Sequence, residues 1–425
     1  MSNCAIVGIN WGDEGKGRMV DLLTEDYDVV IRYQGGGNAG HTVINDQGKF
    51  ALHLLPSGIF RKGTVNILGN GVALDLENLW KEISEVTAQG VSITPENLKI
   101  SDRASLLLPW HRDLDGLEEA RLADKKFGST KQGIAPFYSD KYQKKTILAG
   151  ELFYPEHLKE HAADLMEWKN LTLTRVYGAE GYTIEKLMAW FDEFGSKLKP
   201  FVCDTSEFLE QAQKDGKKIL FEAQLGSLRD LDFGIHPMTT SSNTIAAYAP
   251  VGAGAPGIKL DRIVGVVKAY SSCVGEGPFT CEWFGEEAEK LREAGGEYGA
   301  KTGRPRRVGP VDVVATRYGI KKQAATEIAL TKLDVLSYMD EIPICSKYIV
   351  NGEETDKFPF PVLLADAKPV FTTMPGWKCD ISGVRKFEDL PKEAQDYVRY
   401  LEKAIECRIS YVSVGAEREA IILMD

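Results

Sequence analysis

Hydrophobic residues follow two alternating patterns along the chain. Short, mostly apolar runs of the kind that form buried strands occupy residues 4–9, 29–31, 65–68, 218–221, 263–267, 327–330 and 409–412. Between such runs, apolar residues at 76–86 and 397–405 recur every three or four positions, which predicts one-sided helices. Apolar strands that alternate with helices indicate an α/β fold with a large, mainly parallel central sheet covered by helices on both faces.

Glycine and proline mark the ends of these elements. Gly90 suits the C-terminal stop of the first helix, and Pro391 suits a position in the first turn of the last one. Asn351-Gly352 separates two strand-like runs within residues 342–361, which predicts a hairpin and so a small antiparallel excursion. Since no Pro/Ser-rich linker, repeat or low-complexity tract divides the chain, we expect a single domain over residues 1–425, with insertions.

Two glycine-rich loops follow the first two apolar runs. The first occupies residues 10–18 and precedes residues 19–23, which look like the start of a helix; the second occupies residues 32–42. A strand, a glycine loop and a helix in this order let backbone N–H groups and a helix N-terminus converge on a phosphate. We therefore expect a nucleotide site similar to that of P-loop GTPases.

The first loop departs from the usual P-loop spacing. Six residues separate Gly8 from Gly15-Lys16, where a P-loop has four, and Gly17 replaces the hydroxyl residue that ligates Mg²⁺. Asp13 is the nearest oxygen donor that could take over this ligand position. The loop is thus expected to hold phosphate with a different metal chemistry.

A carboxylate follows the predicted strand at residues 327–330. Asp334, placed at the C-terminal end of that strand, can accept hydrogen bonds from both N1 and N2 of guanine, a donor pair that adenine lacks. The stem of Lys332 can lie along the face of the purine. A Thr-Lys-x-Asp tetrapeptide is a weak signal alone, but beside two phosphate loops it indicates selection of GTP over ATP.

Asp13 and His41 are the candidates for proton transfer. Asp13 suits a magnesium ligand or a general base, with a helix N-cap as the alternative interpretation. His41 lies in a glycine loop between Gly40 and Thr42, and its imidazole can donate a proton or a hydrogen bond to a terminal phosphate. A histidine with a purely structural hydrogen bond is the alternative for that position.

Four cations gather within residues 301–307, between glycines on either side. Arginine binds a carboxylate through two parallel hydrogen bonds, so this cluster suits a carboxylate or phosphate ligand. A solvated run of charges is the alternative. The flanking glycines and the acidic balance of the rest of the chain favour a binding loop.

Composition narrows the class of protein. The net charge of −11 and a pI near 5.3 argue against a non-specific nucleic-acid binder, which needs excess Lys and Arg. No basic and apolar leader starts the sequence, and no apolar stretch approaches the length that spans a membrane. Seven dispersed cysteines without a C-x-x-C pair indicate reduced, buried thiols. We expect a cytoplasmic protein with no nucleic-acid or membrane partner.

Together, these motifs resemble those of the adenylosuccinate synthetase family, the GTP-dependent ligases of purine synthesis. Trp-Gly-Asp-Glu-Gly-Lys-Gly at residues 11–17 and Gly-Asn-Ala-Gly-His-Thr at residues 37–42 carry the resemblance, and matching segments run from Ile6 to the C-terminus. The resemblance implies that L-aspartate is joined to IMP through a 6-phosphoryl-IMP intermediate, giving adenylosuccinate, GDP and phosphate in the first committed step of AMP synthesis. It also implies Mg²⁺ as cofactor and a homodimer.

The resemblance assigns roles to individual residues. Asp13 would be the base at N1 of IMP and His41 the acid at the departing β-phosphate oxygen, with Mg²⁺ held by Asp13 and the Gly40 carbonyl. The implied GTP-binding residues are Gly12, Asp13, Glu14, Gly15, Lys16, Gly17, Arg18, Gly40, His41, Thr42, Arg306, Lys332, Leu333, Asp334, Ser413, Val414 and Gly415. The implied IMP-binding residues are Asp13, Lys16, Asn38, Ala39, Gly40, His41, Thr130, Lys144, Gln224, Leu225, Thr240 and Arg304. The implied aspartate-binding residues are Val274, Lys301, Thr302, Gly303 and Arg304.

Several positions depart from the family pattern and suggest a divergent branch. Lys301 and Pro305 stand where Thr and Arg are usual, and Ala416 replaces a proline. Lys144 occupies the position from which an arginine usually enters the IMP site of the partner subunit; lysine keeps the charge but loses the planar fork.

The family's glutamine before Gly226 is displaced by one position. Either Gln224 or Leu225 therefore faces the purine, and the sequence leaves both open.

Three other classes of function compete with this interpretation. A switch-type GTPase needs a Ser or Thr after Lys16, but this chain has Gly17 at that position. Another nucleotide phosphotransferase, such as a nucleotide kinase, would not need the basic loop around Arg304. A catalytically inactive relative is the third alternative, and it is disfavoured because the chain retains Asp13, Lys16, His41 and Arg304.

Overall fold

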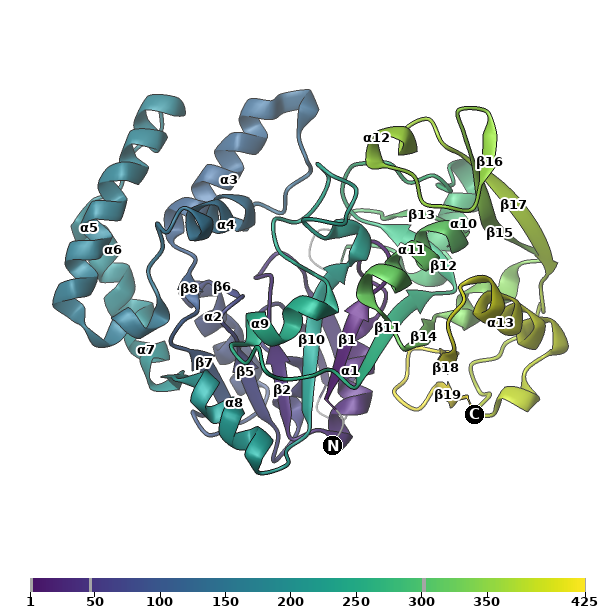
Figure 1. The fold of residues 1–425 in the computed structure, drawn as a ribbon, viewed down its shortest axis with the longest axis horizontal. Helices are drawn as coiled ribbons and strands as arrows, with labels where there is room; N and C mark the ends of the chain where they lie inside the picture. Colours follow the sequence, from purple (N-terminus) through teal and green to yellow (C-terminus); the bar gives the residue numbers. More distant parts are fainter. Residues whose placement is uncertain (1–2, 46–47, 300–302, 425) are drawn as a thin grey trace.

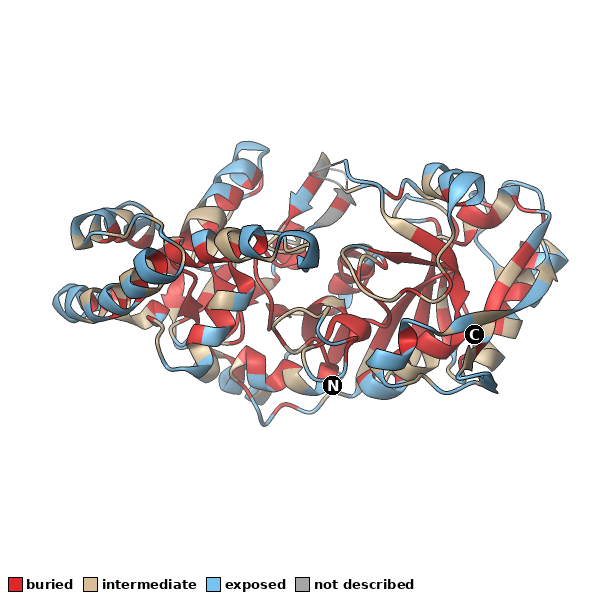
Figure 2. Cartoon of the chain, turned by 90° about the horizontal axis from the view of Figure 1, so that it is seen from above, coloured by how far each residue is buried: buried red, intermediate tan, exposed pale blue. Residues whose placement is uncertain are grey.

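The computed structural model describes residues 3–45, 48–299 and 303–424, without the side chains at positions 41, 42, 44, 45 and 49. A central sheet divides the molecule, with a helical lobe on one side and a second, smaller sheet on the other (Figure 1). Buried residues concentrate along the central sheet, whereas the outer helices of the lobe are largely exposed (Figure 2).

Ten strands form the central sheet in the order β19-β18-β14-β11-β1-β10-β2-β5-β7-β9. Their bounds are β1 Cys4–Gly8, β2 Val29–Arg32, β5 Val65–Leu68, β7 Leu98–Ser101, β9 Val202–Cys203, β10 Ile219–Gly226, β11 Arg262–Lys268, β14 Glu327–Thr331, β18 Ile409–Ser413 and β19 Ile421–Leu423. Every neighbouring pair is parallel except β18 with β19. The predicted α/β fold with a large, mainly parallel sheet is confirmed.

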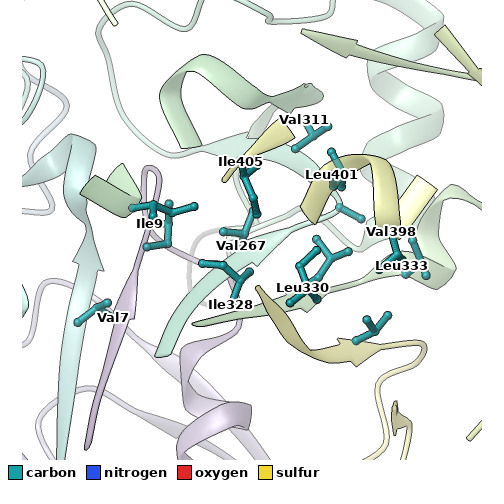
Figure 3. Close-up of a cluster of buried hydrophobic side chains, with 14 of the residues drawn as sticks. Val7, Ile9, Val267, Val311, Ile328, Leu330, Leu333, Val398, Leu401 and Ile405 are labelled. Atoms are coloured by element: carbon teal, nitrogen blue, oxygen red, sulfur yellow. The ribbon is translucent and has the colours of Figure 1, made fainter. Parts of the chain in front are cut away.

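Both faces of this sheet are buried, as its apolar strands require. Val7 of β1 and Ile9, just beyond its end, contribute to a core that includes Leu401 and Ile405 of the C-terminal segment (Figure 3). Ile6, whose side chain points to the opposite face, packs in a separate core with Met19 and Val20. Alternate residues of a single strand thus fill two cores.

The helices around the sheet are α1 Lys16–Leu23, α2 Leu76–Ala88, α8 Thr205–Lys214, α9 Ala249–Ala253, α10 Gly285–Gly295, α11 Val313–Gln323 and α13 Lys392–Ala404. Both helices expected from periodicity are present, as α2 and α13. Asp75 caps α2 by accepting the N–H of Asn78 at 3.1 Å. Pro391 is the N-cap of α13 rather than a first-turn residue, because its ψ of 145° is extended and places it outside the helix.

The second sheet is larger than the hairpin that the sequence predicts. It contains β12 Tyr270–Cys273, β13 Arg307–Asp312, β15 Glu341–Val350, β16 Glu353–Thr355 and β17 Lys368–Pro375. The turn between β15 and β16 is Asn351-Gly352, with φ angles of 54° and 86° that suit these two residues. Strand β17 also pairs with β15, and β12 pairs with β13, so the excursion joins segments distant in the sequence.

The helical lobe was not foreseen from the periodicity. Its helices are α3 Pro109–Leu122, α4 Ile134–Tyr142, α5 Pro155–Leu171, α6 Ile184–Trp190 and α7 Ser196–Leu198. Helices α3, α5, α6 and α7 share a core with α2, β7 and β9, whereas α4 packs in a smaller cluster with Ala73 and Leu107. The remaining elements are β3 His41–Asn45, β4 Gly48–Leu52, β6 Ala73–Leu74, β8 Ser105–Leu106 and α12 Pro361–Leu364.

All seven cysteines lie in the described ranges as free thiols. Four are buried, but Cys379 is exposed and Cys203 and Cys407 are half-buried, so the expectation of uniformly buried thiols was wrong. Across the parts of the chain that the structure describes, no helix is both long and apolar enough to cross a bilayer.

Candidate active site at the carboxyl edge of the sheet

The carboxyl ends of the parallel strands meet along one edge of the central sheet. Strands β1, β2, β10, β14 and β18 all point the same way, so the segments that follow them lie along this edge. Both glycine-rich loops, the Thr-Lys-x-Asp segment and residues 413–415 are among these segments. Ligands of open parallel sheets bind at this edge.

The first loop turns sharply into α1. Gly12, Asp13 and Gly15 have φ angles of 103°, 58° and 97°, in the left-handed region that glycine adopts without strain. Gly15 is the N-cap of α1 and offers no side chain to its first N–H groups. Asp13 is therefore not the helix cap, and the helix N-terminus faces the loop with its donors directed at an incoming anion.

Glu14 holds the first loop in shape. Its buried carboxylate accepts the N–H groups of Asn10 at 3.1 Å and Gly12 at 2.8 Å. The other carboxylate oxygen lies 2.8 Å from the Lys16 ammonium, so the cation at the start of α1 is positioned by the loop itself. Thr331, the last residue of β14, donates its hydroxyl to the Glu14 carbonyl at 2.7 Å and ties the loop to the next motif.

A chain of ion pairs links Asp13 to the Thr-Lys-x-Asp segment. Asp13 Oδ2 lies 3.2 Å from Arg306 Nη2, and Arg306 Nη1 lies 2.9 Å from Glu297 Oε2. The other Glu297 oxygen lies 2.9 Å from Lys332 Nζ and 2.7 Å from Lys268 Nζ. Three motifs that the sequence singled out separately thus share one network.

Glu297 is the centre of this network, and sequence reasoning missed it. The side chain is fully buried, which alone would raise its pKa, but the cations Lys268, Lys332 and Arg306 outweigh burial and hold the pKa well below the ordinary range. Burial lowers the pKa of Lys268 to about 8. No motif marks Glu297 in the sequence, because its role depends on three cations from distant segments.

One carboxylate oxygen of Asp334 can still accept a hydrogen bond. Its Oδ1 is buried and has no hydrogen-bond partner among the described residues, and burial raises the pKa of the carboxyl. The side chain of Arg18 lies between this carboxylate and the C-terminal strand: it donates to Ser413 Oγ at 2.6 Å and to the Gly415 carbonyl. The expected guanine-binding residues are therefore neighbours, with a buried acceptor oxygen unsatisfied.

Gln224 is occupied within the second loop. It is buried, its Oε1 accepts the N–H of Gly36 at 3.2 Å, and its Nε2 donates to the carbonyls of Gly36 at 2.6 Å and His53 at 3.1 Å. Leu225 is half-buried with a φ of 58°, and a Cβ at Gly12 would lie 3.2 Å from the Leu225 Cα. Of the two residues, Leu225 is the one beside the first loop.

Further loops converge around Arg229, a residue that the sequence did not single out. The Arg229 carbonyl accepts the N–H of Thr240 at 2.8 Å, and its guanidinium donates to the carbonyls of Val274 at 2.6 Å and Glu276 at 3.1 Å. Arg304 Nη2 lies 3.5 Å from Glu276 Oε1. The expected aspartate-binding and IMP-binding residues Val274, Thr240 and Arg304 thus belong to one loop cluster.

Asp115 shapes the loop that carries Thr130. This carboxylate of α3 accepts the Ser129 hydroxyl at 2.6 Å and the Gly133 N–H at 2.8 Å, and leaves Thr130 exposed. At the start of the loop, a Cβ at Gly128 would lie 3.6 Å from the Glu276 side chain. The loop therefore reaches the cluster around Arg229.

Some of the remaining expected residues are described by the structure, and others are not. Asn38 accepts the Gly36 N–H at 3.2 Å within the second loop. Lys144 is exposed two residues after the end of α4, with a φ of 61°. The side chains of His41 and Thr42, and the whole of Lys301 and Thr302, lie outside the described part of the structure.

The comparisons with known proteins agree with one another. A family model described as adenylosuccinate synthetase matches residues 5–422. The chain is 44% identical over 425 residues to the adenylosuccinate synthetase of Caldanaerobacter subterraneus subsp. tengcongensis, covering 100% of this chain and 99% of the relative. It is 46% identical over 425 residues to adenylosuccinate synthetase 2 of Pseudoalteromonas translucida, with both chains covered completely. The solved structure of fully ligated adenylosuccinate synthetase from Plasmodium falciparum is similar with a TM-score of 0.93 and 34% identity, over 100% of both chains.

Proposed function

The chain belongs to the adenylosuccinate synthetase family, and on that premise we propose which of its residues carry out the reaction. The enzyme is a GTP-dependent ligase that joins L-aspartate to IMP through 6-phosphoryl-IMP and gives adenylosuccinate, GDP and phosphate. The observation that carries the residue assignment is the position of Asp13, in the phosphate loop and in ionic contact with Arg306.

Asp13 is the base of the first step. The 6-oxygen of IMP is a poor leaving group, and removal of the N1 proton by the carboxylate concentrates negative charge on that oxygen. The oxygen then attacks the γ-phosphate of GTP. Lys16 and the N–H groups at the start of α1 neutralise the phosphate charge, so the protein supplies mainly positioning and electrostatics.

Arg306 controls the availability of this base in the ligand-free chain. Its guanidinium holds the Asp13 carboxylate, whose side chain is 30% exposed and so within reach of a substrate. Arrival of GTP gives Arg306 another partner, the ribose of the nucleotide, and frees the carboxylate for N1.

His41 assists the first step: it donates a hydrogen bond or proton to the departing β-phosphate oxygen of GTP.

The second step uses the phosphorylated oxygen as leaving group. The α-amine of aspartate then attacks C6 of the 6-phosphoryl intermediate, the C6–O bond breaks, and phosphate leaves.

The Asp13 carboxylate and the Gly40 carbonyl fit a magnesium site, because Mg²⁺ prefers oxygen ligands. The Arg306 guanidinium at 3.2 Å from Asp13 Oδ2 marks a place where this structure already stabilises positive charge. Bound there, Mg²⁺ would neutralise charge on the β- and γ-phosphates of GTP.

Asp334 reads the guanine of GTP. Its buried, unsatisfied Oδ1 fits the N1–H and N2–H₂ donors of guanine, and the stem of Lys332 covers the ring. Ser413, Val414 and Gly415 line the opposite side, where Arg18 donates to the Ser413 hydroxyl and the Gly415 carbonyl.

Leu225, rather than Gln224, faces the purine of IMP. The Gln224 side chain accepts the N–H of Gly36 and donates to the carbonyls of Gly36, Ala39 and His53, so this amide positions the second loop. Thr130 and Thr240 bind the IMP phosphate, and Arg304 with Val274 binds aspartate.

The assembly and location follow from the family. We propose a cytoplasmic homodimer of single-domain chains, in which Lys144 enters the IMP site of the partner subunit. Its exposed position after α4 supports this role.

Phosphate release measured with GTP, IMP and aspartate, each omitted in turn, tests the proposal. The ligase releases phosphate only when all three are present, because without aspartate the γ-phosphoryl group stays on the 6-oxygen of IMP. Steady release from GTP alone would instead favour a switch-type GTPase.

A further inference from the structure

Two histidines and a glutamate gather in the helical lobe, apart from the sheet edge. Glu151 belongs to the short helix η4, Ala149–Phe153, and His157 and His161 lie on α5, which lies at the far side of the lobe (Figure 1). One ligand atom from each of the three residues lies within 4.8 Å of the other two.

Local structure fixes this arrangement. His157 and His161 are four residues apart on one helix and so project from the same face. Glu151 Oε1 accepts the Leu148 N–H at 2.8 Å, which turns the other oxygen toward the helix. That oxygen, Oε2, lies 2.7 Å from His161 Nδ1 and 3.3 Å from His157 Nε2.

These distances suit a bound cation. A tetrahedral ion with ligand bonds of about 2.0–2.1 Å holds its donor atoms roughly 3.4 Å apart. The Glu151–His157 separation of 3.3 Å already matches, and the Glu151–His161 separation of 2.7 Å needs to open by about 0.7 Å on this geometry. Two side chains are free to adjust, because His157 is 63% and His161 30% exposed.

The donor set selects the class of ion. Two imidazole nitrogens and one carboxylate oxygen are typical ligands of Zn²⁺ and its transition-metal neighbours, whereas Mg²⁺ and Ca²⁺ prefer oxygen alone. Three protein ligands leave a fourth position, which the exposure of His157 opens to water. Without an ion, each imidazole could simply form a hydrogen bond with the carboxylate. Such hydrogen bonds would not require both rings to approach the same carboxylate oxygen, as they do here.

We propose that Glu151, His157 and His161 form a binding site for one Zn²⁺-class divalent cation, distinct from the nucleotide site. The ion joins η4 to the first turns of α5 and so stabilises the outer part of the helical lobe. It takes no part in ligation, because these residues belong to the lobe and none of them follows a strand at the sheet edge.

Zinc titration of the full-length protein tests the site. Protein freed of metal by EDTA and dialysis is titrated with Zn²⁺ by calorimetry, in parallel with His157→Asn and with Glu160→Gln as a control for an exposed charge on the same helix. We expect one zinc per chain in the wild type and in the control, and at least tenfold weaker binding in His157→Asn. Because His157 is exposed, this substitution leaves folding intact.

A second measurement identifies the ligands. Co²⁺ in place of Zn²⁺ gives visible absorption whose intensity reports tetrahedral coordination, and Mg²⁺ at millimolar concentration does not compete for it. The melting temperature rises with zinc concentration in the wild type but not in His157→Asn. Equal zinc affinity and equal cobalt spectra in wild type and His157→Asn would overturn the proposal, as would the absence of binding at 100-fold excess of zinc. Neither result bears on the ligase activity.

Discussion

Individual residues at the sheet edge were predictable where chemistry and backbone geometry coincide. Asp13 stands in a loop of glycines, which singled it out in the sequence, and the structure places it in ionic contact with Arg306. Asp334 follows a strand, and its Oδ1 has no hydrogen-bond partner within residues 3–45, 48–299 and 303–424. Glu297 and Arg229 escaped prediction, because what defines them is the convergence of cations or carbonyls from segments far apart in the chain.

Asp13→Asn should abolish ligation while GTP still binds. The amide cannot accept the N1 proton, so kcat falls by roughly 10²–10⁴-fold. Steady-state phosphate release with all three substrates measures kcat, and fluorescent GTP analogues measure binding. Asp26→Asn, an exposed change outside the site, is the matched control. Near-normal turnover in Asp13→Asn would disprove the assigned base.

Asp334→Asn should weaken discrimination between GTP and ATP. An amide in place of the carboxylate loses at least one charge-assisted hydrogen bond to guanine, about 1.5–3 kcal/mol, or roughly 10–150-fold in kcat/KM for GTP. The ratio of kcat/KM for the two nucleotides measures the effect, with Asp366→Asn as an exposed control. If the ratio stays as in the wild type, Asp334 does not read the base.

At the scale of elements, strands were easier to predict than helices. Strands buried on both faces carry continuous apolar runs, so β5 was found with its bounds and β10 was found but underestimated. The helices of the lobe show only a weak one-sided pattern because polar residues such as Asp115 are buried in them, whereas apolar residues such as Trp168 and Leu171 are exposed. The partners of β15 were not predictable, since β17 lies beyond an intervening hairpin and helix.

The N-cap residue of α11, Asp312, makes the stability of the protein depend on pH. Asp312 is fully buried and accepts the Ala315 N–H at 2.9 Å; burial raises its pKa from 3.8 to about 6. Because the pKa is raised on folding, the folded protein binds this proton more tightly than the unfolded chain does. The resulting stabilisation is fully present below pH 3.8 and is lost as the pH rises through 6.

Asp312→Asn removes this titration. The free energy of unfolding of the variant, relative to the wild type, should therefore increase by roughly 2–3 kcal/mol between pH 4 and pH 7. Urea unfolding at both pH values measures it, and the Asn side-chain oxygen can still accept the Ala315 N–H, so the helix keeps its cap at each pH. If the difference in unfolding free energy between variant and wild type does not change with pH, ionisation of Asp312 does not destabilise the folded protein.

At the scale of the whole molecule, the proposed dimer makes each active site depend on two chains. If Lys144 enters the partner's site, each active site takes Asp13 from one chain and Lys144 from the other. Asp13→Asn and Lys144→Ala then inactivate a site through different chains. A mixed dimer then has one site with both residues intact.

Equal amounts of Asp13→Asn and Lys144→Ala, unfolded and refolded together, should regain roughly a quarter of wild-type activity, because half of the dimers are mixed and one of their two sites is complete. Phosphate release before and after mixing measures this. Each variant refolded alone is the control. No gain on mixing would place Lys144 in its own subunit's site or outside both.

The outermost strands of the central sheet have a consequence for solubility at high concentration. Strand β9 has two residues and β19 has three, so either rim presents few vacant backbone donors and acceptors to a neighbouring molecule. A wide sheet that tapers in this way resists stacking rim to rim into fibres, even when many copies crowd together.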